Sequence, residues 1–239
     1  PPEIWHNQND EKLVKFDIEA DQVYRNADGF CEVADIGEPG EDLVHLPNGM
    51  YQAYTSDEAN EKKVYRDVFK KGDLWFRSGD LIKVDKDGFF YFVDRVGDTF
   101  RWKGENVATN EVSEAITKFE GVKEANVYGV VIPGTEGKGG MAMVQLDGSA
   151  ESFDFDGLLN HLRHELPRYA IPLFLRIRNQ ESSKTSTLKF HKYEYQQEAF
   201  HMDKVPESDT IYHLSSLTKK YVELTREDYE LIMQQRVRF

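Results

Sequence analysis

The chain has 239 residues, enough for two modest domains or one large one, and its 39% hydrophobic, 13% aromatic and 31% charged residues are typical of a soluble globular protein with a sizeable core. Its formal net charge of −13, from 43 acidic and 30 basic residues, argues against a general nucleic-acid or anionic-membrane binder, although a local cluster of cations still permits an anionic ligand. The lone Cys31 excludes an internal disulfide and a cysteine metal site, and no apolar run predicts a membrane span.

The first part of the chain predicts short strands joined by turns. Residues 1–50 contain several turn sequences, with extended segments expected at 13–18 and 42–46. Residues 56–69 are charged and have helical spacing. A β-hairpin is predicted where 80–84 and 89–93 flank an Asp-Gly turn.

The second part predicts alternating helices and strands. An amphipathic helix is expected over 110–119, capped by Thr109 or Asn110 and ended by Gly121. A second helix is expected over 155–166, before Pro167, and Thr225 begins a capping box for a last helix. Strands are predicted at 125–132, 141–146 and 173–177. This order indicates a small α+β domain that begins near residue 95.

Two polar residues at the predicted hairpin are candidates for nucleotide binding. Asp80 follows Ser78 and Gly79 at the mouth of the hairpin, where a fixed carboxylate can accept hydrogen bonds from two ribose hydroxyls. From these three residues alone, a turn aspartate that caps backbone N–H groups is the better interpretation. Arg95 follows the second strand and either contacts ribose or phosphate oxygens or pairs with a neighbouring carboxylate.

Glycines and basic residues mark further candidate segments. Gly97 and Gly104 bracket Phe100 and Trp102, which fits either a tight loop with two buried rings or a hinge at Gly97. The stretch SSKTSTLKFHK contains lysines that are either solvated or able to neutralise charge on a phosphate in the transition state. A histidine pair three residues apart and the loop GTEGKGG are better read as surface histidines and a mobile loop than as a metal site and a phosphate cradle.

Taken together, these motifs match a family. The run RDVFKKGDLWFRSGDLIKVDKDGFFYFVDRVGDTFRWKGENVATNEV closely resembles the fatty acid transport protein and very-long-chain acyl-CoA synthetase branch of the adenylate-forming enzymes. The likeness continues through EANVYGVVIPGTEGKGGMA, LPRYAIPLFLRI and TSTLKFHK, so it covers most of the chain. RVGDTFRWKGENV is specific to that branch, whereas SGDL and the Asp-Arg pair belong to the wider superfamily. The chain has Ser186 where the family usually has glycine.

The resemblance implies a role for five residues. Asp80 and Arg95 fall on the residues that bind the ribose of ATP or acyl-AMP, and Gly97 falls on the hinge between the large domain and the lid. Lys189 falls on the lysine that bridges the fatty carboxylate and the α-phosphate during adenylation. Lys103 falls on the lid face presented in the thioester step.

The same resemblance implies an organisation and an activity. The expected fold is α+β, with residues 1–94 forming the β-rich tail of a large AMP-binding domain and residues 95–239 forming a mobile lid. The parent would use ATP, Mg²⁺ and coenzyme A to convert a fatty acid into acyl-CoA through acyl-AMP. The alternative is a non-catalytic module that binds acyl-CoA or a partner within a fatty acid transporter.

The start of the chain and the resemblance also imply a larger parent. Because the chain begins without methionine, we expect a piece of a longer protein, with the phosphate loop and the acyl tunnel upstream and little complete activity in the piece alone. The resemblance implies an intracellular parent associated with the endoplasmic reticulum, peroxisome, lipid droplet or plasma membrane. Its partners would be the upstream domain of the same protein and its substrates, without nucleic acid and without a metal site in these residues.

Overall fold

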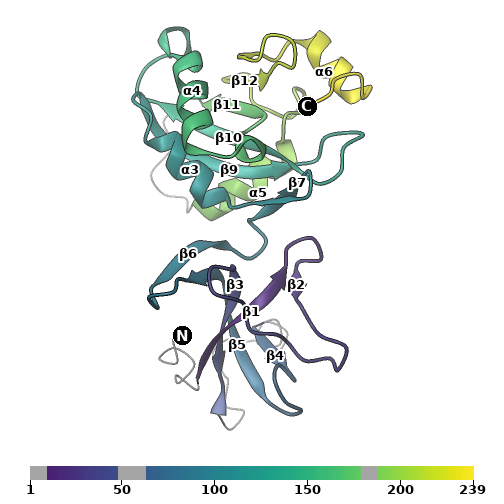
Figure 1. Cartoon of the computed structure of the whole chain (residues 1–239). Coiled ribbons are helices and arrows are strands. Elements are labelled where there is room, and N and C mark those ends of the chain that lie inside the picture. The colour runs from purple at the N-terminus through teal and green to yellow at the C-terminus, as the bar shows by residue number, and fades with distance from the viewer. Residues whose placement is uncertain (1–9, 48–62, 179–187) are drawn as a thin grey trace. The chain divides into compact units, whose positions relative to one another are not determined.

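The chain has a mixed α+β fold, as expected, and folds as two compact units. The computed structural model describes residues 10–47, 63–178 and 188–239, with the backbone alone for 188–191. Unit 1 is Pro1–Gly97 and unit 2 is Asp98–Phe239 (Figure 1). Each unit has its own hydrophobic core.

Unit 1 is built on one antiparallel sheet. The strand order is β2-β1-β3-β5-β4, and β6 also pairs with β5. The strands are β1 (Glu11–Asp17), β2 (Gln22–Val23), β3 (Gly40–His45), β4 (Val64–Arg66), β5 (Leu74–Val84) and β6 (Phe90–Arg95). The predicted hairpin is confirmed, with Val84 opposite Phe90 across the Asp-Gly turn.

The helix predicted over 56–69 is wrong for the part of it that the structure describes. Val64–Arg66 is strand β4, in which Tyr65 pairs with Trp75 of β5. The residues after β4 form a turn because the Asp73 carboxylate accepts the backbone N–H groups of Val68, Phe69 and Lys70 at 2.6, 3.0 and 3.2 Å. A side chain that satisfies these groups removes the need for helical hydrogen bonds.

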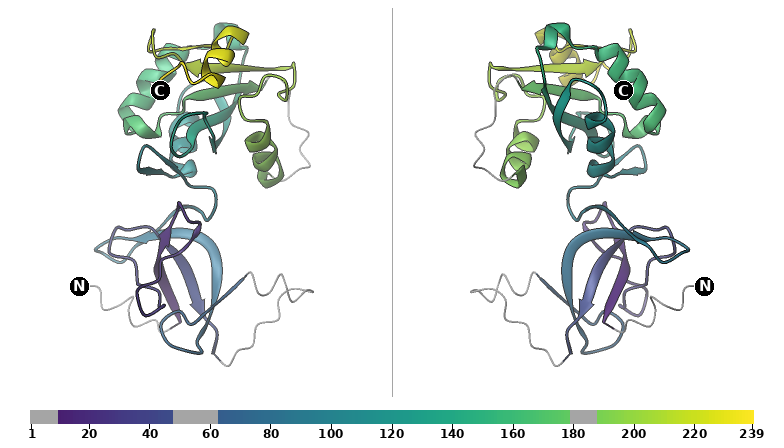
Figure 2. Two further views of the ribbon diagram at one scale, coloured as in Figure 1. Left: turned by 90° about the vertical axis from the view of Figure 1, so that its right-hand side faces the viewer. Right: turned by 90° about the vertical axis from the view of Figure 1, so that its left-hand side faces the viewer.

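Unit 2 is a five-stranded sheet of order β13-β12-β11-β10-β9, with a separate two-stranded hairpin of β7 and β8. All eight residues of β10 are buried, which requires cover on both faces of the sheet. Helices α3 and α4 cover one face and α5 lies on the other (Figure 2). The strands are β7 (Phe100–Trp102), β8 (Glu105–Val107), β9 (Val122–Val130), β10 (Gly139–Leu146), β11 (Phe174–Arg178), β12 (Asp209–Leu214) and β13 (Tyr221–Glu223).

Unit 2 contains helices that the sequence predicted near 110–119 and 155–166 and after Thr225, and one over 188–198 that it did not predict. They are α3 (Thr109–Thr117), α4 (Phe155–Glu165), α5 (Leu188–Glu198) and α6 (Arg226–Met233), with short 3₁₀ turns η2 (Ala150–Ser152) and η3 (Arg168–Ala170). The capping box of Thr225 and Asp228 is confirmed at the start of α6. The predicted cap of α3 is wrong, because the N-cap is Ala108 and makes no side-chain cap bond. No helix in the described residues is both long and apolar enough to cross a bilayer.

Candidate functional site

Asp80 and Arg95 face each other across the hairpin of β5 and β6. The two residues are register partners, and Arg95 Nε lies 3.4 Å from Asp80 Oδ1. Asp80 Oδ1 is buried and has no hydrogen-bond donor among the described residues. The Arg95 side chain is 55% exposed, so it remains accessible to a ligand. A carboxylate oxygen with spare acceptor capacity beside an accessible guanidinium fits the hydroxyl groups of a ribose.

A second carboxyl group, that of Asp42, interacts with the charge of Asp80. Asp42 of β3 is only 9% exposed, and Ser78, on the strand that carries Asp80, donates a hydrogen bond from its hydroxyl to the Asp42 carbonyl at 3.0 Å. Burial, followed by the charge of Glu11, raises the pKa of Asp42 from 3.8 to about 6. The folded unit therefore favours the protonated carboxyl, and the stability that this provides is lost as the pH rises from 3.8 to about 6.

We expect Asp42→Asn to stabilise unit 1 selectively near neutral pH. The difference in free energy of unfolding between the variant and the unchanged chain should be larger at about pH 7.5 than at about pH 4, by up to about 3 kcal/mol. The reason is that the buried aspartate must be charged at the higher pH, whereas asparagine has no charge to desolvate. Urea unfolding at the two pH values measures the difference. Asp87→Asn, an exposed change in the hairpin turn, is the control. An equal gain at both pH values would contradict the assignment to Asp42.

The residues on either side of Gly97 are both bonded to other parts of the chain. On one side the Val96 N–H donates to the Gly79 carbonyl at 2.9 Å. On the other, Asp98 pairs with Lys192 of α5 at 3.0 Å, and Lys192 also donates to the Thr109 hydroxyl at 2.9 Å. Gly97 itself has φ 83°, and no atom lies within 4 Å of the position of a Cβ. This local geometry suits a residue that changes its backbone conformation.

Lys103 occupies a tight turn between β7 and β8. Trp102 pairs with Glu105, which leaves Lys103 and Gly104 as a two-residue loop with φ values of 51° and 86°. Positive φ at both positions is the signature of a type I′ hairpin turn, and the first of them is held here by a non-glycine residue. The rings of Phe100 and Trp102 are 4% and 3% exposed. The interpretation as a tight turn with two buried rings is therefore confirmed.

The loop GTEGKGG helps to hold the β7–β8 hairpin in place. The Lys138 N–H donates to the Arg101 carbonyl at 2.7 Å, and Gly137 forms a bridge with Trp102. A Cβ on Gly137 would lie 2.3 Å from the Arg101 carbonyl oxygen, so the approach requires glycine. In the same way Phe100 packs so closely on Gly129 that a Cβ there would meet the ring at 2.7 Å. The loop thus contributes to the position of Lys103.

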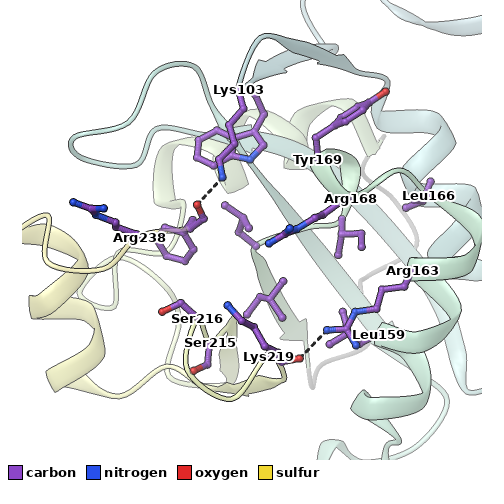
Figure 3. Close-up of a pocket in the computed structure, with 15 residues that line it drawn as sticks. Lys103, Leu159, Arg163, Leu166, Arg168, Tyr169, Ser215, Ser216, Lys219 and Arg238 are labelled. Atoms are coloured by element: carbon purple, nitrogen blue, oxygen red, sulfur yellow. Dashed lines mark hydrogen bonds between the residues drawn. The ribbon is translucent and has the colours of Figure 1, made fainter.

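A cavity of about 690 Å³ lies next to Lys103 (Figure 3). Its volume falls within the usual range of small-molecule sites. Five of its lining residues are basic, and none of the described residues that line it is an aspartate or a glutamate: Lys103, Arg163, Arg168, Lys219 and Arg238. In a chain of net charge −13, this is the local cluster of cations that the total charge conceals. The chemistry of the cavity favours an anionic ligand with apolar parts.

The cavity was missed by the sequence analysis apart from Lys103. Its other cations come from α4, η3, the β12–β13 turn and the segment after α6, so they are far apart in the sequence. No local motif connects them, and only the fold brings them together.

For Lys189 the structure describes the backbone and not the side chain. It lies in the first turn of α5, but its side chain is outside the described residues, as is Ser186. The two histidines of α4 have ordinary environments: His161 Nε2 lies 3.0 Å from the Ala115 carbonyl, and His164 is exposed beside Glu165. Among the described residues no cluster of histidine, cysteine or acidic side chains could hold a metal ion.

The comparisons with known proteins define the class. Residues 111–189 match the family described as "AMP-binding enzyme C-terminal domain". The chain also resembles a solved structure of O-succinylbenzoate coenzyme A synthetase from Bacillus subtilis in complex with AMP, with a TM-score of 0.53 and 26% identity over 72% of this chain and 30% of that one.

Sequence relatives narrow the class to one branch. The chain is 43% identical to long-chain fatty acid transport protein 6 of Mus musculus, over 95% of this chain and 36% of the relative. It is 38% identical to the very long-chain fatty acid transport protein of Cochliobolus heterostrophus, over 98% of this chain and 38% of the relative. The resemblance to the fatty acid transport branch of the adenylate-forming enzymes is therefore confirmed. The chain spans a little over a third of the length of these relatives.

Proposed function

We propose that the chain is the C-terminal part of a long- or very-long-chain fatty acid–CoA ligase that forms AMP. The observation that carries this proposal is the cavity of five cations around Lys103, within a unit that contains an AMP-binding enzyme C-terminal domain. Coenzyme A matches such a cavity because it carries phosphates on one end and an apolar pantetheine chain on the other. Lys103 would contact coenzyme A in the thioester step.

The adenylation step is assigned to other residues. Asp80 and Arg95 would bind the ribose of ATP and of acyl-AMP, in keeping with the free acceptor capacity of Asp80 Oδ1. Lys189 would bridge the fatty carboxylate and the α-phosphate, where catalysis depends on positioning and on neutralisation of charge. Mg²⁺ would arrive with ATP, on its phosphates.

The chain would then contribute to two different parts of the enzyme. Residues 1–94 would complete a large AMP-binding domain whose remainder lies upstream, and residues 95–239 would form the lid, with Gly97 as the hinge. A lid that rotates about this residue offers Lys189 for the first step and the Lys103 cavity for the second. We also place the whole protein at the endoplasmic reticulum, peroxisome, lipid droplet or plasma membrane, as the names of its relatives suggest a role in fatty acid transport.

The test separates the two half-reactions in the whole protein, because a part that spans about a third of its relatives is expected to lack complete activity. Lys103→Ala should lower kcat/KM for coenzyme A in the thioester step by about 10- to 100-fold, the effect of losing a hydrogen bond to a charged group. Formation of acyl-AMP, followed as pyrophosphate release, should stay within about twofold of the unchanged enzyme. Lys138→Ala, in the adjoining loop but outside the cavity, is the matched control.

The competing function is a non-catalytic module that binds acyl-CoA or a partner in a fatty acid transporter. It predicts that Lys103→Ala weakens acyl-CoA binding while the whole protein makes acyl-CoA at an undiminished rate. That combination would refute the ligase assignment of this residue.

A further inference from the structure

One side of the Lys103 cavity is built by residues that follow the matched domain. The domain match ends at residue 189, yet the chain continues through β12, β13 and α6. We call residues 209–239 the brace. It contributes six of the fifteen residues that line the cavity: Leu214, Ser215, Ser216, Lys219, Arg238 and Phe239 (Figure 3). The cavity is therefore incomplete without the brace.

The end of α6 directs the last residues of the brace back to the cavity. Gln235 has φ 60°, its N–H donates to the Ile232 carbonyl, and the Arg236 N–H donates to the Leu231 carbonyl, both at 2.9 Å. These bonds form a Schellman motif, which ends a helix and reverses the chain. Phe239 then packs against the buried Phe174 with a ring separation of 5.6 Å. The aromatic contact fixes where the backbone of residue 239 lies.

Two cations of the cavity are held by main-chain oxygens of the brace. Lys103 Nζ donates to the main-chain oxygen of Phe239, the last residue of the chain, at 2.6 Å, and an Arg163 guanidinium N–H donates to the Lys219 carbonyl at 2.9 Å (Figure 3). Lys219 has φ 58°, in a turn where the Ser215 hydroxyl accepts a backbone N–H group. These contacts connect the brace to residues on the hairpin and on α4.

The kind of partner matters for the charge of the cavity. A carboxylate would orient a lysine or an arginine and also cancel its charge. A neutral carbonyl orients the cation through a hydrogen bond and leaves its charge available for an anion. The brace thus restricts the motion of Lys103 and Arg163, and the Lys219 carbonyl does so without cancelling the charge of Arg163.

We propose that the brace is a positioning element of the thioester step: it holds Lys103 and Arg163 toward the phosphates of coenzyme A. This inference rests on the proposed function for the identity of the anion. It assigns a role to residues 209–239 that the matched domain does not include. Phe239 is the residue through which the role is best tested, because its ring anchors the carbonyl that Lys103 contacts.

The first experiment measures the thioester step of the whole protein with Phe239→Ala. We expect the KM for coenzyme A to rise about fivefold to tenfold, since one charge-assisted hydrogen bond loses its fixed acceptor. The rate of acyl-AMP formation should remain within about twofold. Phe239→Leu should bring the KM for coenzyme A most of the way back to that of the unchanged protein, because leucine refills the space against Phe174. Leu217→Ala, also in the brace but 92% exposed and outside the cavity, is the control.

A double-mutant cycle distinguishes positioning from general stability. If Phe239 acts through Lys103, then Phe239→Ala should have little further effect on the KM for coenzyme A in the Lys103→Ala background. An equal effect in both backgrounds, or a lower melting temperature with an unchanged KM, would overturn the proposal. So would a Lys103→Ala variant with an unchanged thioester step.

A binding measurement keeps this inference separate from the proposed function. Titration of adenosine 3′,5′-bisphosphate into the 239-residue chain should show weaker binding for Phe239→Ala by about fivefold to tenfold. If this loss of binding is seen but the whole protein forms no acyl-AMP, the positioning role of the brace is supported and the ligase assignment is refuted. If acyl-AMP and acyl-CoA form normally and binding is unchanged, the ligase assignment stands and the brace proposal fails.

Discussion

Replacing Lys189 by alanine in the whole protein is expected to slow acyl-AMP formation by about 100- to 1000-fold, because it removes the side chain that is proposed to bridge the fatty carboxylate and the α-phosphate. Thioester formation from supplied acyl-AMP should be largely spared, since that step is assigned to the Lys103 cavity. Pyrophosphate release measures the first half-reaction, and acyl-CoA formation from synthetic acyl-AMP measures the second. The expected pattern is the reverse of that for Lys103→Ala.

The Lys189 experiment has a matched control in the same unit. Lys204→Ala removes an exposed lysine that follows α5 and should leave both half-reactions unchanged. An intact first half-reaction in Lys189→Ala would refute the role given to this residue, whatever the result for Lys103. Loss of both half-reactions together with a lower melting temperature would indicate damage to the fold instead.

The second large effect is expected from Arg176→Ala, which should reduce the free energy of unfolding of unit 2 by about 3–5 kcal/mol. Arg176 is 2% exposed and donates to Asp209 at 2.7 Å and to Glu198 at 2.5 Å. Its guanidinium also lies 4.9 Å from the ring centre of Tyr195. Alanine would leave the buried Asp209 carboxylate without its cation. Chemical denaturation measures the loss.

An exposed ion pair of similar length provides the control. Arg226 donates to Asp203 at 2.8 Å, but the two side chains are 56% and 71% exposed. Arg226→Ala should therefore cost less than about 1 kcal/mol. Combining Arg176→Met with Asp209→Asn and Glu198→Gln should recover much of the stability by removing the unpaired charges. A similar loss in both arginine-to-alanine variants would contradict the role of burial.

The elements that the sequence analysis predicted correctly have strong local signals. The hairpin of β5 and β6 follows from two apolar strands around an Asp-Gly turn, and α4 follows from its leucine spacing. By contrast, the residues of β4 were predicted as helix because the segment is charged and has helical spacing. Its pairing with β5, and the bonds from Asp73 to the turn that follows it, depend on residues outside that segment. Strands β12 and β13 were not predicted, since their place at the sheet edge depends on β11.

The candidate site also has one part that local sequence could predict and one part that it could not. That Asp80 and Arg95 lie opposite each other follows from the register of one hairpin, so local reasoning could anticipate a joint role. The cation cavity depends on α4, η3, a turn and the brace meeting in space, and single arginines in these segments look like ordinary surface residues. Only Lys103 stood out, through its motif.

The restraints on either side of Gly97 have a stereochemical consequence. With the Val96 N–H bonded to the Gly79 carbonyl and the Asp98 side chain paired with Lys192, Gly97 is an achiral residue between two neighbours that other parts of the chain hold. Glycine crosses between positive and negative φ at almost no steric cost, whereas any L-residue with a side chain strongly favours one sign. The presence or absence of a single methyl group thus determines whether this stretch of chain has two accessible backbone states or one.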